Sequence, residues 1–480
     1  MPVLFQSHRT LTWIGSSREG YLWPVYLICV FILGPERWMH TDSAYTLFRI
    51  LNHQSLFYDR WACELLVWPG QILAYWGAPI NWVMQSLNLC LPLMMWGAWL
   101  LFPNSTHRWL YFAMAFLGGS EAFFIGYSEI GLSTWAFITA IQCLSMNLKK
   151  NWIALPTLLL IMLNAHPAAW IYVPFLALFT AILFPGKKAF ITLSVCLVLG
   201  LLKWIFVETN SYDTGLIAHF RDSLDIHTIT NSFSFHHIQS AAYFFIPHAT
   251  LIACFCVSIF KPWRWQFTAF TLAFYSALIA SVIVYSDGDA TINMEKFFYP
   301  VSILGILSLA FYSSLSNSAK YGTTFSKDKA IRFNYTNKII NFIPWFIALC
   351  FMINLQYPLA LYQNRLLQLE KITRQMKNNK EIQADEFLQK KLIGSTWAIP
   401  YETALTSTRM NLSSTHTIKN ENFATILDPE KMKEMQIRIG DSLFLGAVFE
   451  LPQSIQAINS QYFYFPAKSC YQVIYQNLPP

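Results

Sequence analysis

The chain has 480 residues, of which 55% are hydrophobic and only 12% carry a charge. Soluble proteins carry about 25% charged residues. The low charge, together with a mean hydropathy of +0.36, excludes a disordered chain and predicts that lipid surrounds most of the protein. The net charge of +7 does not indicate a nucleic-acid partner, because the basic residues lie in short loops between apolar segments.

Apolar segments recur along most of the chain. A helix that crosses a bilayer needs about 17–25 mainly apolar residues. Eleven segments approach this pattern, the first and the fifth of them short: 20–35, 83–102, 109–127, 129–147, 152–164, 168–185, 189–207, 240–260, 267–285, 297–315 and 339–360. We therefore predict an all-α polytopic membrane bundle of eleven transmembrane helices.

The segment 61–76 is apolar enough to count as a twelfth span. Glu64 near its start and the Pro69-Gly70 pair in its middle favour instead a helix that lies on, or dips into, the outer surface of the membrane. We keep eleven spans, because a twelfth would move every later loop to the other side.

The basic residues predict the orientation of the chain, since cytoplasmic loops are enriched in Lys and Arg. With the amino terminus inside, 14 of the 20 basic residues before position 361 fall on the cytoplasmic side. We expect an integral, multi-pass protein with a cytoplasmic amino terminus, in a membrane of the bacterial inner-membrane type.

The chain divides into two predicted domains. Residues 1–360 form the transmembrane domain, with a long first outer loop at 35–82, and residues 361–480 form a tail that eleven crossings place outside. The tail begins with a charged amphipathic stretch, while 435–449 and 462–465 have strand-like patterns. We predict a small extracytoplasmic α+β domain.

Acidic residues gather toward the outer side: 13 of the 15 before position 361 lie outside or near the outer ends of spans. In the first outer loop, Asp42 precedes a short amphipathic helix with Arg49 and His53 on its polar side, and its apolar residues recur at helical spacing: Ala44, Leu47, Phe48 and Leu51. Asp42 has two interpretations that stay open, as the cap of this helix and as a catalytic carboxylate.

Two further acids, Glu121 and Glu129, belong to the third and fourth apolar segments. An acid at membrane depth is a functional candidate. Glu129 also has a structural explanation, because the dipole at a helix start favours a negative charge, and a buried hydrogen bond would explain Glu121.

His166 lies in the tight outer turn between the fifth and sixth segments, and Lys203 lies near the outer end of the seventh. His166 is either a hydrogen-bonding turn residue or a group that titrates near neutral pH. Lys203 either extends to the membrane interface or binds a lipid phosphate.

The later outer loops add charged groups without a metal motif. The loop 208–239 contains a second amphipathic stretch, and a further loop contributes Asp287, Asp289 and Lys296. Asp287 and Asp289 could coordinate a divalent ion through oxygen atoms, but a solvated turn is the preferred interpretation, so no metal site is predicted and the cofactor stays unknown.

This arrangement resembles the GT-C superfamily of membrane glycosyltransferases. Members of that superfamily have an inner amino terminus, a first span, and a long outer loop with an essential acid and surface helices. They commonly carry a second acid at the outer junction of spans three and four, and many have an outer carboxy-terminal domain. Asp42 matches the first acid, and Glu129 or Glu121 matches the second. His166 and the loop 208–239 lie where members often contact donor or acceptor.

The chain departs from the family pattern in three ways. Asp42 is followed by Ser43, no acidic pair occurs at the second position, and several relatives have more spans than the eleven expected here. These departures leave metal dependence and substrate class open.

The resemblance implies transfer of a sugar from a lipid-linked, polyprenyl-phosphate donor to a glycan, lipid or protein acceptor on the outer side of the bilayer. Asp42 would act as the base, and Arg49, Lys203 or Lys296 would face the phosphate. His40, in the same outer loop, joins the candidate substrate-binding residues.

Two other functions fit a chain of this composition. A multi-pass transporter or lipid flippase would suit eleven spans with a few intramembrane charges, although the acids favour the outer rim over the midplane. A glycan polymerase or ligase would use similar donors, with the large outer loop rather than Asp42 dominating.

Overall fold

The computed structural model describes the following residues: 18–54, 58–101, 109–117, 122–145, 153–166, 169, 172–173, 176, 187–206, 348–349, 351–352, 355–356, 359–374, 398–413, 415, 436–439, 442–445 and 459–464. The spans expected at 240–260, 267–285 and 297–315 lie outside these residues, as do most of those expected at 168–185 and 339–360.

Four described helices begin and end within a few residues of expected apolar segments. They are α6 (Ile80–Leu101), α8 (Glu129–Ser145), α9 (Ala154–Ala165) and α11 (Lys187–Phe206). The first expected span is divided, because a 3-10 turn η1 (Arg18–Tyr21), α2 (Leu22–Ile32) and α3 (Gly34–Trp38) follow one another there.

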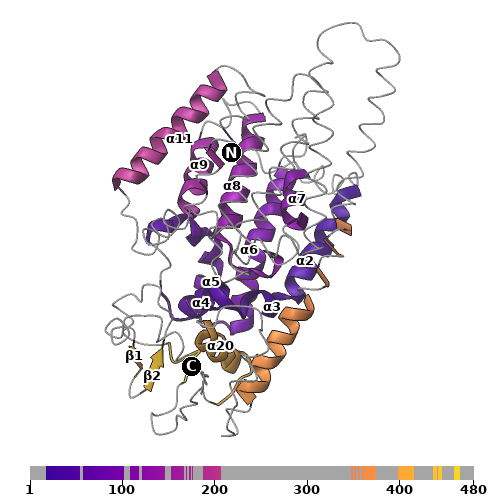
Figure 1. Ribbon diagram of the computed structural model, residues 1–480, viewed down its shortest axis with the longest axis vertical. Helices are drawn as coiled ribbons and strands as arrows, with labels where there is room; N and C mark the ends of the chain where they lie inside the picture. The colour runs from indigo at the N-terminus through magenta and orange to yellow at the C-terminus, as the bar shows by residue number, and fades with distance from the viewer. Residues whose placement is uncertain are drawn as a thin grey trace, which may run out of the picture.

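Helix α6 lies at the centre of the described part and contacts α2, α5, α7 and α8 (Figure 1). Asn88 donates to the carbonyl of Val30 in α2 at 2.5 Å, and the indole N–H of Trp135 in α8 donates to the carbonyl of Met94 at 3.1 Å. Side-chain donors thus join α6 to α2 and to α8.

By length and hydropathy, α6 is the one helix among the described residues that could cross a bilayer, and the helices α2, α8 and α9 are apolar but shorter. Helix α2 is apolar on every side, since Trp23 and Val30 are buried while Ile28 and Phe31 are exposed. A helix that is hydrophobic all round belongs in a protein core or in lipid.

The third expected span is not one continuous helix. Helix α7 (Trp109–Leu117) is followed by a 3-10 turn η3 (Ala122–Phe124) and by non-helical residues up to 128, so the expected helix over 109–127 is wrong at its carboxyl end. Two tertiary hydrogen bonds to Arg37 hold this end out of the helical conformation. The Nε of Arg37 donates to the carbonyl of Phe123 at 2.6 Å, and the N–H of Gly126 donates to the carbonyl of Arg37 at 3.1 Å.

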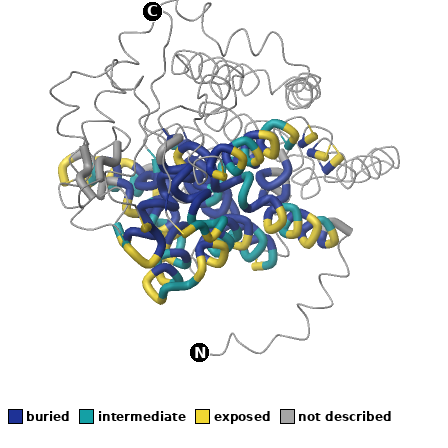
Figure 2. The backbone as a smooth tube through the Cα atoms, turned by 90° about the horizontal axis from the view of Figure 1, so that it is seen from below, coloured by how far each residue is buried: buried dark blue, intermediate teal, exposed yellow. Residues whose placement is uncertain are grey.

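Aromatic rings fill the core between α2, α7, η3 and the segment around 351. Phe112 stacks on Phe116 at 4.3 Å between ring centres, and Tyr26 lies 5.1 Å from Phe116 and 6.2 Å from Phe351. Buried residues occupy the centre of the described part, and exposed ones lie along its outer turns (Figure 2).

The loop 35–82, expected on the outer side, contains α4 (Thr41–Leu51), a 3-10 turn η2 (Tyr58–Cys63) and α5 (Glu64–Tyr75). Apart from Asp42, every residue of α4 is buried, so the expected polar side is exposed only in part: Arg49 is covered, whereas His53, just after the helix, is exposed. Helix α20 (Ile399–Arg409) covers α4, with the ring of Tyr401 5.1 Å from both Tyr45 and Phe48.

Described residues of the tail lie against the first outer loop. The helical segment 359–374 brings the ring of Tyr362 to 4.7 Å from that of His40. The side-chain amide of Asn459 donates to the carbonyl of Leu51 at 2.9 Å. In the expected strand-like stretch, β1 (Gln436–Ile439) and β2 (Ser442–Leu445) form an antiparallel hairpin with Ile437 opposite Phe444.

Candidate functional site

Asp42 is the second residue of α4 and the exposed residue of that helix. The residue before the helix is His40, and its side chain makes no cap hydrogen bond. The first N–H of the helix, that of Thr41, donates instead to Glu402 Oε1 of α20 at 2.8 Å. An acceptor from the tail therefore takes the capping role that the sequence suggested for Asp42.

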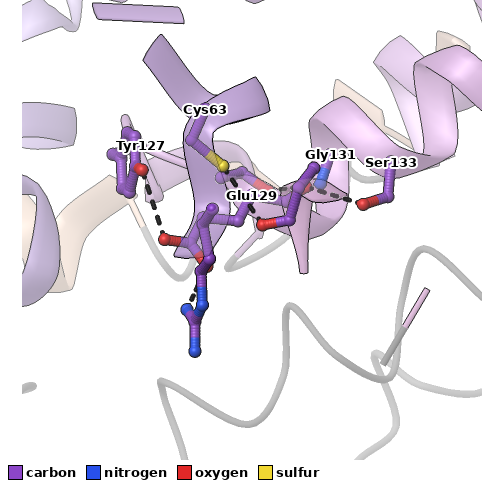
Figure 3. Close-up of polar contacts among 8 residues, drawn as sticks. Cys63, Tyr127, Glu129, Gly131 and Ser133 are labelled. Atoms are coloured by element: carbon purple, nitrogen blue, oxygen red, sulfur yellow. Dashed lines mark hydrogen bonds and ion pairs between the residues drawn. The ribbon is translucent and has the colours of Figure 1, made fainter. Parts of the chain in front are cut away.

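Glu129 begins α8 and is buried, with 8% of its surface exposed. Its Oε2 forms an ion pair with Arg60 of η2, and its Oε1 accepts a hydrogen bond from the Tyr127 hydroxyl at 3.2 Å (Figure 3). Because both carboxylate oxygens are engaged, Glu129 serves to hold Arg60 and Tyr127 in place.

Asp42 and Glu129 lie close to each other although 87 positions separate them in the numbering. The N–H of Tyr127 donates to Ser43 Oγ at 3.1 Å, which joins the start of α4 to the residues that precede α8. Ser43 directly follows Asp42, and Tyr127 lies two positions before Glu129, so this hydrogen bond brings the two acids into one region. The two acids that the sequence singled out in the first loop and at the start of the fourth segment thus belong to one cluster.

The turn η2 connects this cluster to the carboxyl end of α9. The thiol of Cys63, labelled in Figure 3, donates to the carbonyl of Ala165 at 3.1 Å. Burial, followed by the charge of Glu129, holds the pKa of the Cys63 thiol well above its ordinary value, so the thiol stays protonated and acts as a donor.

His166 and Lys203 lie at the same end of α9. His166 is the residue after the last turn of this helix, with extended backbone angles, and its carbonyl accepts the N–H of Ala169 at 2.9 Å. Lys203 of α11 donates from Nζ to the carbonyl of Leu163 at 2.9 Å. A cation at a helix carboxyl end satisfies a terminal carbonyl and complements the dipole.

Asp42, Glu129, His166 and Lys203, predicted from separate parts of the sequence, are therefore linked by a chain of contacts through α4, η2, α8, α9 and α11. Two other candidates lie outside the described residues, namely Glu121 and Lys296.

His40 and Arg49 are buried and take structural positions. His40 Nδ1 lies 3.0 Å from the Thr41 hydroxyl, and Nε2 bonds the carbonyl of Phe124. Burial lowers the pKa of His40 to about 3, so the ring is neutral. Arg49 lies over the ring of Tyr45 at 5.6 Å. These contacts hold α4 in place.

Three residues that sequence reasoning passed over complete this region: Arg60, Arg365 and Glu402. Arg60 stands 69 positions from its partner, and Thr41 stands 361 positions from Glu402. No local pattern marks such pairs. Within the described ranges, no group of three metal-binding side chains occurs.

Chemically, the exposed carboxylate of Asp42 can accept a proton or a hydrogen bond from a ligand, whereas Glu129 and Arg60 neutralise each other beneath it. No protein-family model, curated protein or solved structure matches this chain.

Proposed function

We propose that this chain is a membrane glycosyltransferase of the GT-C type that moves a sugar from a polyprenyl-phosphate donor to an acceptor at the outer face of a bilayer. The observation that carries the proposal is the cluster of Asp42 and Glu129 at the start of α4 and α8. Family members have one acid in each of these places, and sequence distance gave no reason for the two to meet.

The difference in exposure supports different roles for the two acids. Asp42 is exposed and takes the proton of the acceptor hydroxyl as the acceptor oxygen attacks the anomeric carbon of the sugar. The bond between that carbon and the phosphate oxygen breaks, and the electron pair leaves with the carrier phosphate. Glu129 holds Arg60 in place through their buried ion pair.

The membrane setting is part of the same proposal. Exposed large apolar side chains recur along one side of η2 and α5, as lipid contact requires: Trp61, Leu65, Trp68, Ile72 and Tyr75. Trp and Tyr favour the membrane interface. Helix α5 has 12 residues, about 18 Å at about 1.5 Å per residue, which is shorter than a bilayer core of about 30 Å, and its row of exposed apolar side chains supports a helix that lies on the outer surface.

The test measures sugar transfer by membranes that contain the full chain, with polyprenyl phosphate carrying radiolabelled glucose, galactose or mannose as donors. Asp42→Asn should lower transfer by about 100-fold or more, since loss of a general base costs 10²–10⁴-fold. The matched control is Glu36→Gln, an acid of the same loop in α3. Full activity of Asp42→Asn at equal protein level would remove the base assignment. Movement of labelled lipid or solute across the bilayer without transfer would favour a transporter.

A further inference from the structure

The start of α4 has a strained backbone. Thr41, directly before Asp42, has a φ of +43°, and a β-branched residue in this left-handed region is a genuine outlier. Such strain persists only where the surroundings enforce it, and it is concentrated at functional sites.

Two buried contacts enforce this conformation. The Thr41 N–H donates to Glu402 Oε1 at 2.8 Å, and the Thr41 hydroxyl lies 3.0 Å from His40 Nδ1. Glu402 is fully buried and forms an ion pair with Arg365 of the helical segment 359–374. The acceptor that holds Thr41 is thus itself held from a second element of the tail.

The same part of α20 also clamps the body of α4. Tyr401, next to Glu402, packs its ring against Tyr45 and Phe48, one and two turns after Asp42. One helix of the tail therefore fixes both the first turn of α4 and the face beneath it, and Asp42 alone of this helix stays exposed.

Resting on the proposed function, we propose that Glu402 is a positioning residue: by accepting the Thr41 N–H, it holds the first turn of α4 in a strained conformation that directs the Asp42 carboxylate toward the acceptor. The tail is then a working part of the transferase site. Misplacement of a reacting group by about 1 Å can cost about 100-fold in rate, so this contact controls turnover more than binding.

A pair of double variants separates the hydrogen bond from the buried charges. Arg365→Met with Glu402→Met removes both charges and the acceptor, and replacing a buried ion pair by apolar residues of similar volume often preserves stability. Arg365→Met with Glu402→Gln removes the same charges but keeps an amide oxygen for Thr41. The control is Glu370→Gln, which removes the ion pair with Arg409, a second contact between the segment 359–374 and α20 that does not touch Thr41.

Two measurements are made on the full chain in membranes or detergent. Hydrogen exchange of the peptide 39–48 should rise in the Met/Met variant but not in the Met/Gln variant or the control. The kcat for transfer from the donors used above should fall about 100-fold in the Met/Met variant, with KM for the donor nearly unchanged, while Met/Gln retains most of the kcat.

The two double variants differ in whether residue 402 keeps an acceptor for Thr41. Equal kcat values in the two would overturn the positioning role, whether both values are high or both are low. If exchange rises in the Met/Met variant and its kcat is unchanged, Glu402 caps α4 without directing Asp42, and the inference also fails while the proposed function stands. If the wild type transfers no sugar, the proposed function fails, the positioning role falls with it, and exchange alone reports whether Glu402 holds α4.

Discussion

At the scale of single residues, two neighbouring carboxylates differ in their surroundings. Glu129 is buried with Arg60 and Tyr127 as partners, and Asp42 is exposed at the start of α4. Burial makes the ion pair a structural element, because a charge without its partner inside a protein is very costly. The exposed acid is the one that can meet a substrate.

Removing one partner of this ion pair should lower the free energy of unfolding more than removing both partners. Arg60→Met leaves Glu129 buried without its cation and should lower the free energy of unfolding by about 3–5 kcal/mol. Adding Glu129→Gln should restore most of the loss, since no buried charge is left. Thermal unfolding in detergent measures both variants. A double variant as unstable as Arg60→Met would contradict this account.

His40 should make stability depend on pH. Burial lowers its pKa to about 3, compared with about 6.5 for an unfolded histidine. Between these values the unfolded chain binds a proton that the folded chain does not, so the contribution is complete above about pH 6.5 and is lost as the pH falls toward 3.

The measurement compares unfolding midpoints at about pH 7.5 and 5.5, either side of the ordinary histidine pKa. His40→Gln keeps a donor and an acceptor but cannot titrate, so its midpoint should fall less than that of the wild type. His53→Gln changes an exposed histidine and should behave as the wild type does. An equal fall of the unfolding midpoint between the two pH values in all three proteins would show that His40 does not control the loss of stability in acid.

At the scale of elements, close packing decides how α5 and α6 meet. Gly70 of α5 lies against Leu87 of α6, and a Cβ at Gly70 would lie 2.5 Å from two atoms of the Leu87 side chain. The small residue lets the helices approach, and it lies next to Pro69 inside α5. A Pro-Gly pair commonly interrupts a helix, yet α5 continues through Pro69 and Gly70, and the face that carries Gly70 packs on α6.

A matched pair of glycine variants tests this contact. Gly70→Ala should destabilise the protein by about 1–3 kcal/mol, the usual cost of overpacking. Gly97→Ala, in α6, places its Cβ where no atom lies within 4 Å, and should be neutral or stabilising by up to about 1 kcal/mol through helix propensity. Chemical denaturation in detergent compares the two. Equal effects would mean that the approach of α5 to α6 is not close-packed.

At the scale of the whole molecule, described segments of the tail pack against the loop 35–82. The N–H of Asn459 donates to Asn52 Oδ1 at 2.8 Å, and the hydroxyl of Tyr462 donates to the carbonyl of Ala78 at 2.7 Å. If the loop faces the outer side, the described tail segments must lie on that side with it.

Reporter fusions test this orientation. Alkaline phosphatase should be active when fused after residues 54, 78 or 375, and a fluorescent protein should be bright after residues 106 or 150, because the basic residues of those two loops stay in the cytoplasm. Cytoplasmic signals after 78 but not after 54 would mean that 61–76 crosses the bilayer. If the fluorescent protein were bright after 54, 78 and 375 and alkaline phosphatase were active after 106 and 150, Asp42 would lie on the cytoplasmic side.

Several features of this protein follow from its sequence alone. Long apolar segments predicted the extents of α6, α8, α9 and α11 to within a few residues, since an apolar helix must end where polar residues begin. Charge placement also selected Asp42, Glu129, His166 and Lys203 as candidates, and the structure links all four.

Tertiary structure alone decided the surroundings and partners of each candidate residue. The amphipathic pattern of α4 predicted an exposed polar side, but Arg49 on that side is covered, and Glu402 rather than Asp42 caps the helix. The ion pair between Arg60 and Glu129 is likewise visible only in the tertiary structure. The physical reason is that burial and hydrogen-bond pairing depend on residues far apart along the chain, which local periodicity and composition do not bring together.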